Sequence, residues 1–291
     1  MSIDITALYC CLDDFCKIYE EWEQHKLIPS DKKRRRPGKL SLSEMLLIMV
    51  LFHLSPYKHF KAFYLVGIGQ IYRSCFVELP HYDRFVSLMP RLFGPFMILL
   101  HALSGEETGI YFADSTQLAV CHNRRIRRHK VFDGLAARGK TTMGWFFGFK
   151  LHFVINHKGE IMACRITPGN KSDSSVLDDI TRTLTGKVYA DKGYIGKACF
   201  QKLWQRGLHL ITGIRRNMKN YLMPMADKIM LRKRFIIETI LDTLKSEMGL
   251  EHSRHRSPIN AMVHILSCLT AYAFRPEKPS ISLNGKQIAY P

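Results

Sequence analysis

Two aspartates stand where apolar runs of the sequence end, and their position suggests a cation site. Asp114 follows residues 111–113, and Asp191 follows residues 188–190. A carboxylate where a buried strand emerges is costly to desolvate when unpaired, so a cation or a hydrogen-bonding loop must compensate it. Ligands of open α/β sheets gather at the carboxyl ends of strands. Either aspartate alone is also typical of a turn cap.

A third carboxylate, Glu238, lies in a predicted helix that carries two cations at matching positions. At about 100° per residue, Arg234, Glu238 and Lys245 fall within about 40° of one another. An apolar face adjoins this stripe, so Glu238 is expected at the margin between core and solvent. Alone, the pattern is that of a surface ion pair. Together with Asp114 and Asp191 it predicts a two-metal phosphodiester site.

Longer motifs surround these acids and carry a resemblance to a known family. The second acid stands in Asp-x-Gly-Tyr and the third in Arg-x3-Glu-x6-Lys. Further stretches are CHNRR (121–125), HKVF (129–132), RGKTTMGWF (138–146), TPGN (167–170) and EHSRHRSP (251–258). Over essentially the whole chain these motifs resemble the DDE transposases of bacterial insertion sequences, and closely the insertion-sequence 982 family. In the broader group a Tyr often stands three residues before the Arg, where this chain has Leu231, so no role of that Tyr is carried over.

The resemblance implies a ribonuclease H-like catalytic domain with a mixed sheet. In such a domain the strand ending at Asp114 lies about 4.8 Å from the parallel strand ending at Asp191, and Glu238 arrives from the C-terminal helix. These hard oxygen ligands suit Mg²⁺ or Mn²⁺, and two ions are expected. Arg234 and Lys245 match family positions that contact DNA near the scissile phosphate. Lys192 is a further candidate for that contact.

The activity that the resemblance implies is DNA transposition. Hydrolysis at the terminal inverted repeats of the insertion sequence frees a 3′-hydroxyl, which the same site then joins to target DNA. Two other functions stay open, a metal-dependent nuclease on the same fold and a catalytically silent DNA-binding protein. The expected partner is double-stranded DNA, as element ends and as target. Cleavage at two ends predicts a homodimer or a larger assembly on DNA.

A cation-rich segment between the first two strands is expected to bind DNA. Residues 123–143 contain a single acid, Asp133. The cations are Arg124, Arg125, Arg127, Arg128, Lys130, Arg138 and Lys140. Next to an active site such a loop grips the phosphate backbone and adds little sequence information; the alternative is a solvated loop. Of the three aromatic residues at 145–147, which could stack on unpaired bases, at least two are expected in the core.

The elements that must position these residues change in character near residue 105. Beyond it the sequence predicts strands over 109–114, 149–156, 161–167, 187–190 and 208–212, and helices over 174–184, 198–206, 233–248 and 259–274. This alternation predicts an α/β catalytic domain with a mixed sheet over 106–279, followed by a C-terminal tail over 280–291.

Residues 1–105 are predicted to be helical throughout. A capping box at residues 41–44 precedes an apolar run over 45–52, a second helix follows the break at Ser55-Pro56, and a third covers 82–92. With five cations at 32–36, these three short helices predict a helix-turn-helix DNA-binding domain. The alternative is a helical cap with one solvated basic loop.

Composition limits the classes of protein that the chain can represent. Of its 291 residues 46% are hydrophobic, which excludes disorder of the chain as a whole. The net charge of +18 favours a polyanionic partner. Residues 106–291 hold 30 basic and 15 acidic residues, and so most of the excess. The longest clean apolar run has 8 residues and the N-terminus does not read as a signal peptide, so we expect neither membrane insertion nor export. The eight scattered cysteines are expected to be reduced, as in a bacterial cytoplasmic, nucleoid-associated protein.

Overall fold

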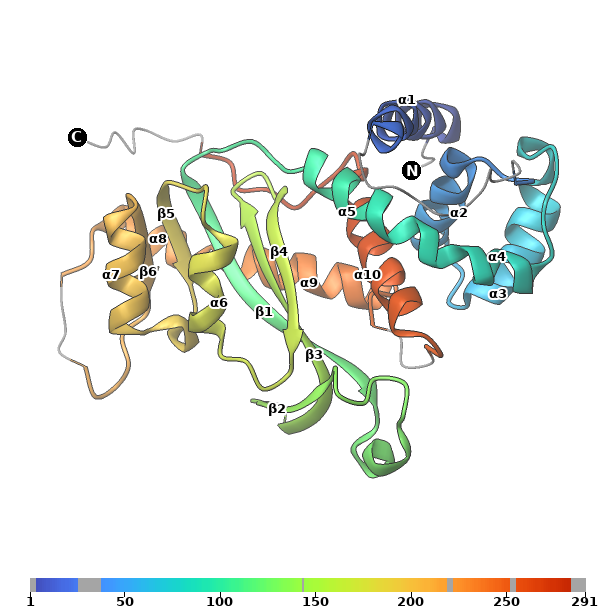
Figure 1. The fold of residues 1–291 in the computed structure, drawn as a ribbon. Coiled ribbons are helices and arrows are strands. Elements are labelled where there is room, and N and C mark those ends of the chain that lie inside the picture. The colour runs from blue at the N-terminus through green and yellow to red at the C-terminus, as the bar shows by residue number, and fades with distance from the viewer. Residues whose placement is uncertain (1–3, 26–37, 143, 219–221, 252–254, 284–291) are drawn as a thin grey trace. The chain divides into compact units, whose positions relative to one another are not determined.

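The computed structural model describes residues 4–25, 38–142, 144–218, 222–251 and 255–283, which divide into two units (Figure 1). The first, here called the helical unit, combines Met1–Ala102 with Ser246–Leu250 and Arg256–Arg275. The second, here called the sheet unit, comprises Leu103–Lys245, Glu251–His255 and Pro276–Pro291. The chain therefore crosses between the units several times.

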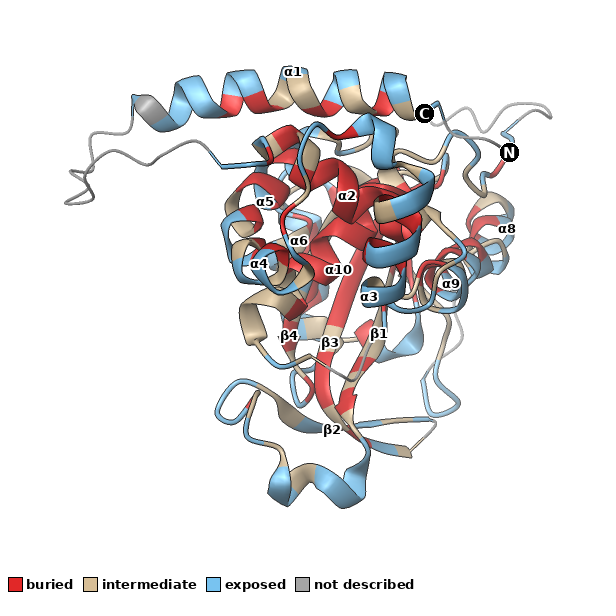
Figure 2. Ribbon diagram, turned by 90° about the vertical axis from the view of Figure 1, so that its right-hand side faces the viewer, coloured by how far each residue is buried: buried red, intermediate tan, exposed pale blue. Residues whose placement is uncertain are grey.

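The helical unit is built around α2 (Leu42–Leu54), which is apolar on every side and buried along most of its length. The predicted capping box starts this helix. The Glu44 N–H donates to Ser41 Oγ (3.1 Å), and the Ser41 N–H donates to Glu44 Oε2 (2.6 Å). A helix without a polar face needs cover all round, and α1 (Ile5–Gln24) and α10 (Pro258–Ala273) pack against it. Figure 2 shows α2 and α10 as largely buried.

The remaining helices of this unit are short and follow one another closely. They are α3 (Phe60–Ala62), the π-helix η1 (Phe63–Ile71), the 3₁₀ helix η2 (Arg73–Cys75), α4 (Tyr82–Leu88), the 3₁₀ helix η3 (Met89–Leu92) and α5 (Phe93–Ala102). The stretch Tyr82–Ala102 is long and apolar enough to cross a membrane, by length and composition alone, although the longest clean apolar run of the sequence has only 8 residues. Within the unit η3 and α5 pack against α10, and 39% of the apolar window is buried; one helix of this kind is weak evidence for a membrane span.

The two units and the predicted domains place one long helix differently. The sequence predicts α10 in the catalytic domain, but α10 packs with α2 and α5. Its residues are buried almost without interruption from Ala261 to Tyr272, so it too needs apolar partners on several sides. The helices over 42–88 agree in order with the predicted ones, and their DNA-binding role stays a prediction. The cations at 32–36 lie outside the described residues.

The sheet unit contains a mixed six-stranded sheet. Its strands are β1 (Ile110–Cys121), β2 (Ala137–Thr141), β3 (Gly144–Asn156), β4 (Ile161–Pro168), β5 (Gly186–Ala190) and β6 (Leu208–Thr212). The order is β2-β3-β1-β5-β6, and β4 pairs with β3 beside β2. β3 is antiparallel to β1, β2 and β4, whereas β5 is parallel to both β1 and β6. The predicted α/β class and mixed sheet are confirmed.

Helices cover both faces of this sheet, and the alternation of β1 decides which residues meet which helices. Tyr111 and Ala113 share a core with α6 (Asp173–Ile180) and α7 (Lys197–Gln205). The next residue in each case points to the opposite face. On that face α9 (Phe235–Asp242) packs against β1, and α8 (Met225–Arg232) against β5 and β6 (Figure 1).

Three local predictions were wrong in detail. The segment over 123–143 is not one loop: it contains a 3₁₀ turn, η4 (Asn123–Arg128), and the strand β2, while Met143 lies outside the described residues. The helix α8 was missed, and the helix predicted over 233–248 is α-helical only to Asp242, continuing as the π-helix η6 (Thr243–Glu247). Of the predicted tail, 284–291 lies outside the described residues.

Candidate active site

The sheet brings Asp114 and Asp191 to adjacent strands. β1 and β5 pair in parallel with Ala113 opposite Ala190, and an aspartate follows each of these two alanines. Neighbouring strands lie about 4.8 Å apart, which places the two carboxylate-bearing backbones side by side. Asp191 is exposed and starts a 3₁₀ turn (Lys192–Tyr194), whose Tyr194 N–H donates to the Asp191 carbonyl (3.0 Å). The expected adjacency of these strands is confirmed.

Asp114 does not end its strand, which corrects the sequence prediction. β1 continues to Cys121 because its antiparallel pairing with β3 goes on, whereas the parallel pairing with β5 stops at Ala113. Burial changes at the same point, from fully buried residues before Asp114 to half-buried ones after it. Asp114 therefore lies at the point where β1 loses β5 as a neighbour and remains paired with β3.

Burial makes Asp114 an unusual carboxyl group. Desolvation raises its pKa to about 6, although the Ser115 N–H (2.8 Å from Oδ1) and the charge of Arg234 oppose that rise. The nearby negative charges of Glu238 and Asp191 raise the pKa further. Three carboxylates thus interact at this edge, and the ionised form of Asp114 lacks full compensation.

Arg234 links two of these carboxylates. Its Nη1 donates to Asp114 Oδ2 (3.3 Å) and its Nη2 donates to Glu238 Oε1 (2.8 Å). Arg234 and Glu238 are four residues apart at the start of α9, as the predicted stripe requires, and the Arg234 side chain is only 18% exposed. The guanidinium therefore lies between the carboxylate of β1 and the carboxylate of α9.

The chemistry of these side chains fits a divalent cation, although they do not form a closed cage. Among the described residues, no three His, Cys, Asp or Glu side chains form a group that could hold a metal ion. Asp114, Asp191 and Glu238 nevertheless offer hard oxygen ligands of the kind that bind Mg²⁺ or Mn²⁺ with few protein contacts. A cation beside Asp114 would supply the compensation that its raised pKa shows to be incomplete.

The two lysines predicted near this site differ in their surroundings. Lys245 Nζ donates to the Gln117 carbonyl (2.7 Å) and pairs with Glu251 (3.4 Å), so it fastens η6 to β1 beyond Asp114. The pairing of Glu251 with the Ala119 N–H (3.0 Å) extends this contact. Lys192 is exposed next to Asp191, and its side chain lies against Gly213.

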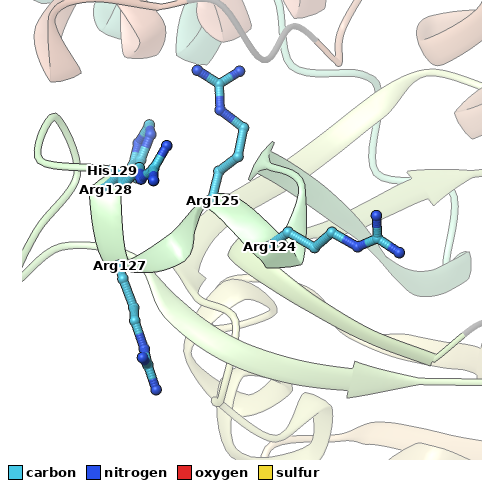
Figure 3. A pocket seen from close by; sticks show the side chains of 5 residues that line it. All are labelled: Arg124, Arg125, Arg127, Arg128 and His129. Atoms are coloured by element: carbon cyan, nitrogen blue, oxygen red, sulfur yellow. The ribbon is translucent and has the colours of Figure 1, made fainter.

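The seven predicted DNA-binding cations lie on an exposed part of the sheet unit that we call the basic arm, residues 123–141. Arg124, Arg125, Arg127 and Arg128 come from η4 and leave the turn in different directions, lining a pocket with His129 (Figure 3). Lys130 follows the turn and is exposed. Arg138 and Lys140 stand on β2, where Gly139 between them is buried and leaves no room for a Cβ beside Gly169.

An exposed tryptophan accompanies these cations. Trp145 is 54% exposed, Phe146 is buried and Phe147 is half-buried, so only Phe146 lies in the buried core, where at least two of the three aromatic residues were predicted. The Arg138 guanidinium and the Lys140 ammonium lie 5.3 Å and 5.7 Å from the Trp145 ring centroid. An exposed aromatic ring with two cations close to it is suited to a base with its phosphate.

Sequence reasoning missed Asp173, whose position at the start of α6 suggests only a helix terminus. Its carboxylate instead accepts hydrogen bonds from Ser115 Oγ (2.8 Å) and Lys150 Nζ (3.2 Å). The sequence feature that could have indicated this role is the alternation of Lys150 and His152 with apolar residues on β3. It places two polar side chains on a buried face, where they need a polar partner.

The chain is similar to a known sequence family and, more distantly, to solved structures. A sequence model of the transposase DDE domain family matches residues 104–258, just over half of the chain. A cryo-EM structure of the piggyBac transposase synaptic complex with hairpin DNA has 10% identity and a TM-score of 0.48, covering 83% of this chain and 68% of that chain. A crystal structure of the Mos1 strand transfer complex has 10% identity and a TM-score of 0.24, covering 90% and 87%. No curated protein matches the sequence.

Proposed function

Because the chain belongs to the DDE transposase family, we propose that it is a DNA transposase acting on the terminal inverted repeats of its insertion sequence. Asp114, Asp191 and Glu238 are the proposed catalytic carboxylates. The observation that carries this assignment is their arrangement within the matched region: two on adjacent parallel strands, and the third joined to the first through Arg234. The resemblance of the motifs to the insertion-sequence 982 family supports a bacterial element.

We also infer a ribonuclease H-like fold for the sheet unit. The order β4-β3-β1-β5-β6, with β3 antiparallel and the others parallel to β1, supports it. Helices on both faces agree with that inference. In this arrangement the catalytic carboxylates come from two central strands and from α9.

The proposed reaction consists of two displacements at phosphorus. In the first, a water oxygen attacks at the element end, the bond from phosphorus to the 3′ oxygen breaks, and a 3′-hydroxyl is freed. In the second, the oxygen of this hydroxyl attacks a target phosphodiester. The target's own bond from phosphorus to its 3′ oxygen breaks and leaves a 3′-hydroxyl on the target, so the strands are joined without a covalent protein–DNA bond. Mg²⁺ or Mn²⁺ bound by the three carboxylates, as two ions, would supply Lewis acidity at the phosphate and lower the pKa of water.

Arg234 has two roles in this proposal. Without a cation it shares its guanidinium between Asp114 and Glu238 and limits the repulsion of these carboxylates. Once both carboxylates have another positive partner, its forked donors are free to bind a phosphate oxygen. Lys192 is a further candidate for phosphate contact because it is exposed beside Asp191.

Lys245 needs a different description from the one that the motif suggests. Its ammonium already has the Gln117 carbonyl and Glu251 as partners. We therefore propose that Lys245 reaches DNA only by leaving Glu251, and that its first role is to hold η6 on β1. The cations of the basic arm are the proposed backbone contacts on either side of the cleaved end.

The decisive experiment incubates the purified chain with labelled DNA from the flanks of its coding sequence and Mg²⁺ or Mn²⁺. We expect cleavage and joining by the wild type and neither by Asp114→Ala, Asp191→Ala or Glu238→Ala. Asp179→Ala is the matched control, since Asp179 is an exposed acid paired with Arg165. Cleavage without joining would favour a nuclease, and binding without cleavage a silent DNA-binding protein. Equal activity of all variants would refute the site.

Recognition of the repeat is proposed for the helical unit, and the structure changes how to test it. Deleting residues 1–105 would strip α10 of its partners α2 and α5, so a truncated chain is a poor probe. Substitutions at the exposed cations Lys61 and Arg84 leave the core intact. We expect Lys61→Glu with Arg84→Glu to reduce the preference for the repeat over unrelated DNA. An unchanged preference would assign recognition to the sheet unit.

Two further parts of the proposal follow from the reaction. Two element ends must be cut together, so we propose a homodimer or larger assembly on DNA, which light scattering with and without paired ends would test. We propose a cytoplasmic, nucleoid-associated protein, and the eight free cysteines are compatible with a reducing compartment. Fluorescence of a tagged copy over the nucleoid tests that location.

A further inference from the structure

A second polar cluster lies behind the proposed catalytic edge, on the other face of β1. Successive residues of a strand point to opposite faces, so Ser115 points away from the face of Asp114. Across the sheet Ser115 pairs with His152 of β3, and Gln117 pairs with Lys150. These side chains therefore share the face that α6 covers.

Asp173, the first residue of α6, is the centre of this cluster. Its Oδ1 accepts hydrogen bonds from Ser115 Oγ (2.8 Å) and Lys150 Nζ (3.2 Å), and His152 Nδ1 lies 3.7 Å away. The side chains of Lys150, His152 and Asp173 are 12%, 0% and 23% exposed. A half-buried carboxylate with one cation and one hydroxyl donor is held in a single geometry.

The side chains of His152 and Tyr194 belong to the same cluster, and both are neutral. Burial lowers the pKa of His152 to about 4, and its Nε2 lies 2.9 Å from Thr167 Oγ1. Burial, with the charges of Asp114 and Asp173, raises the pKa of Tyr194 well above its usual value. Tyr194 ends the turn that begins at Asp191. The cluster therefore contacts β1 one residue after Asp114 and lies within electrostatic reach of the turn after Asp191.

We propose that Asp173 is a positioning residue: through Ser115 it fixes β1 at the point where Asp114 must meet Asp191. β1 needs such support because its parallel partner ends at Ala113, one residue earlier. The Ser115 N–H also donates to Asp114 Oδ1, so a shift of Ser115 moves a donor of the catalytic carboxylate. Misplacement of reacting groups by about 1 Å costs up to about a hundredfold in rate. The inference rests on the proposed function.

Two substitutions separate positioning from simple stability. Ser115→Ala removes the hydroxyl that joins β1 to Asp173 but leaves the Asp173–Lys150 ion pair. Asp173→Asn keeps an acceptor for Ser115 but leaves Lys150 without its counter-charge. We expect Ser115→Ala to lower kcat for cleavage about tenfold, with KM for DNA and the urea midpoint unchanged. Asp173→Asn is expected to lower the urea midpoint and to keep kcat within about threefold of the wild type.

A double-mutant cycle and a metal titration complete the test. Asp173→Ala should match Ser115→Ala in kcat, and the double variant should be no slower, because both remove one link. Mn²⁺ binding without DNA, followed by electron paramagnetic resonance, should weaken about threefold to tenfold in Ser115→Ala and not in the control Asp179→Asn. Wild-type Mn²⁺ affinity in Ser115→Ala, or a greater loss of kcat in Asp173→Asn, would overturn the proposal. If the wild type cleaves no DNA, the proposed function fails and the Mn²⁺ titration alone decides this inference.

Discussion

The proposed catalytic edge and the basic arm belong to the same sheet but hold their charges in opposite ways. At the edge, Asp114 and Arg234 are about four-fifths buried and joined by a hydrogen bond. On the arm, four arginines leave one exposed turn in different directions. Within the part of the chain that the structure describes, no ion pair joins a cation of the arm to an acid.

The difference teaches where single substitutions should matter. Desolvated charges interact strongly with their neighbours, so removing one changes the state of the others. Exposed charges are screened and contribute through their number, chiefly by releasing counterions from DNA. The edge should therefore respond sharply to one change, and the arm only to several.

The sharpest expected response is that of Asp114→Asn. We expect cleavage to fall at least about a thousandfold, the scale on which one preorganised group contributes to catalysis. The same change should stabilise the fold, because the pKa of Asp114 is raised to about 6 and its ionised form is penalised near neutral pH. We expect a gain of about 1–3 kcal/mol in the free energy of unfolding at pH 7.5.

The gain in stability of Asp114→Asn is expected to depend on pH. A carboxyl group whose pKa is higher in the folded protein destabilises the fold progressively as pH rises from 3.8 to about 6. The gain of Asp114→Asn should thus be complete above pH 6 and shrink toward pH 4, as followed by urea unfolding. Asp133→Asn, an exposed acid of the basic arm, is the control. A loss of stability at pH 7.5 would contradict the burial argument.

The arm should respond only when several cations are removed together. Replacing Arg124, Arg125, Arg127 and Arg128 by Gln should reduce the salt slope of DNA binding by about 3.6 units, since each phosphate contact contributes about 0.9. Fluorescence anisotropy from 50 to 300 mM NaCl measures it. A charge-matched control replaces exposed cations elsewhere on the unit: Arg165, Arg182, Lys197 and Lys202. Equal slopes for the two variants would show that the arm is merely solvated.

Arg234 tests whether the edge behaves as one coupled unit. Arg234→Met removes the guanidinium that lies between Asp114 and Glu238. We expect Mn²⁺ to bind about tenfold more tightly in the absence of DNA, because no cation then competes for these carboxylates. Cleavage should nevertheless decline. Arg232→Met, a change at an exposed residue just before α9, is the control. Unchanged Mn²⁺ affinity would mean that Arg234 serves DNA alone.

The edge was largely predictable from sequence, for a physical reason. Short apolar runs followed by acids mark strands that emerge from a core, and the motif resemblance placed these strands side by side. The continuation of β1 past Asp114 was not predictable, because it depends on pairing with β3 through residues that are polar or half-buried. Asp173 was hidden for a similar reason: an acid at a helix start reads as a local cap.

The arm and α10 show the limits of composition and local pattern. Because Arg138 and Lys140 are charged, the sequence did not suggest the strand β2. The feature that does reflect its pairing is Gly139, which is buried between them. α10 was predicted correctly as a helix, and its packing against α2 and α5 is what its own sequence does not show. An apolar helix needs partners, and its sequence does not say which ones.

Trp145 is the one residue of this region expected to matter singly, and it sharpens the contrast. Its ring is exposed, and the cations of Arg138 and Lys140 lie within 6 Å of its centroid. Stacking on an unpaired base is worth about 1–3 kcal/mol, so Trp145→Ala should weaken binding of single-stranded ends at least about fivefold. Duplex affinity and the salt slope should stay unchanged, because no charge is lost. Trp145→Phe should retain most of the affinity, and Leu135→Ala, at another exposed apolar residue, should have no effect. An equal loss on duplex DNA would instead make Trp145 part of the general backbone contact.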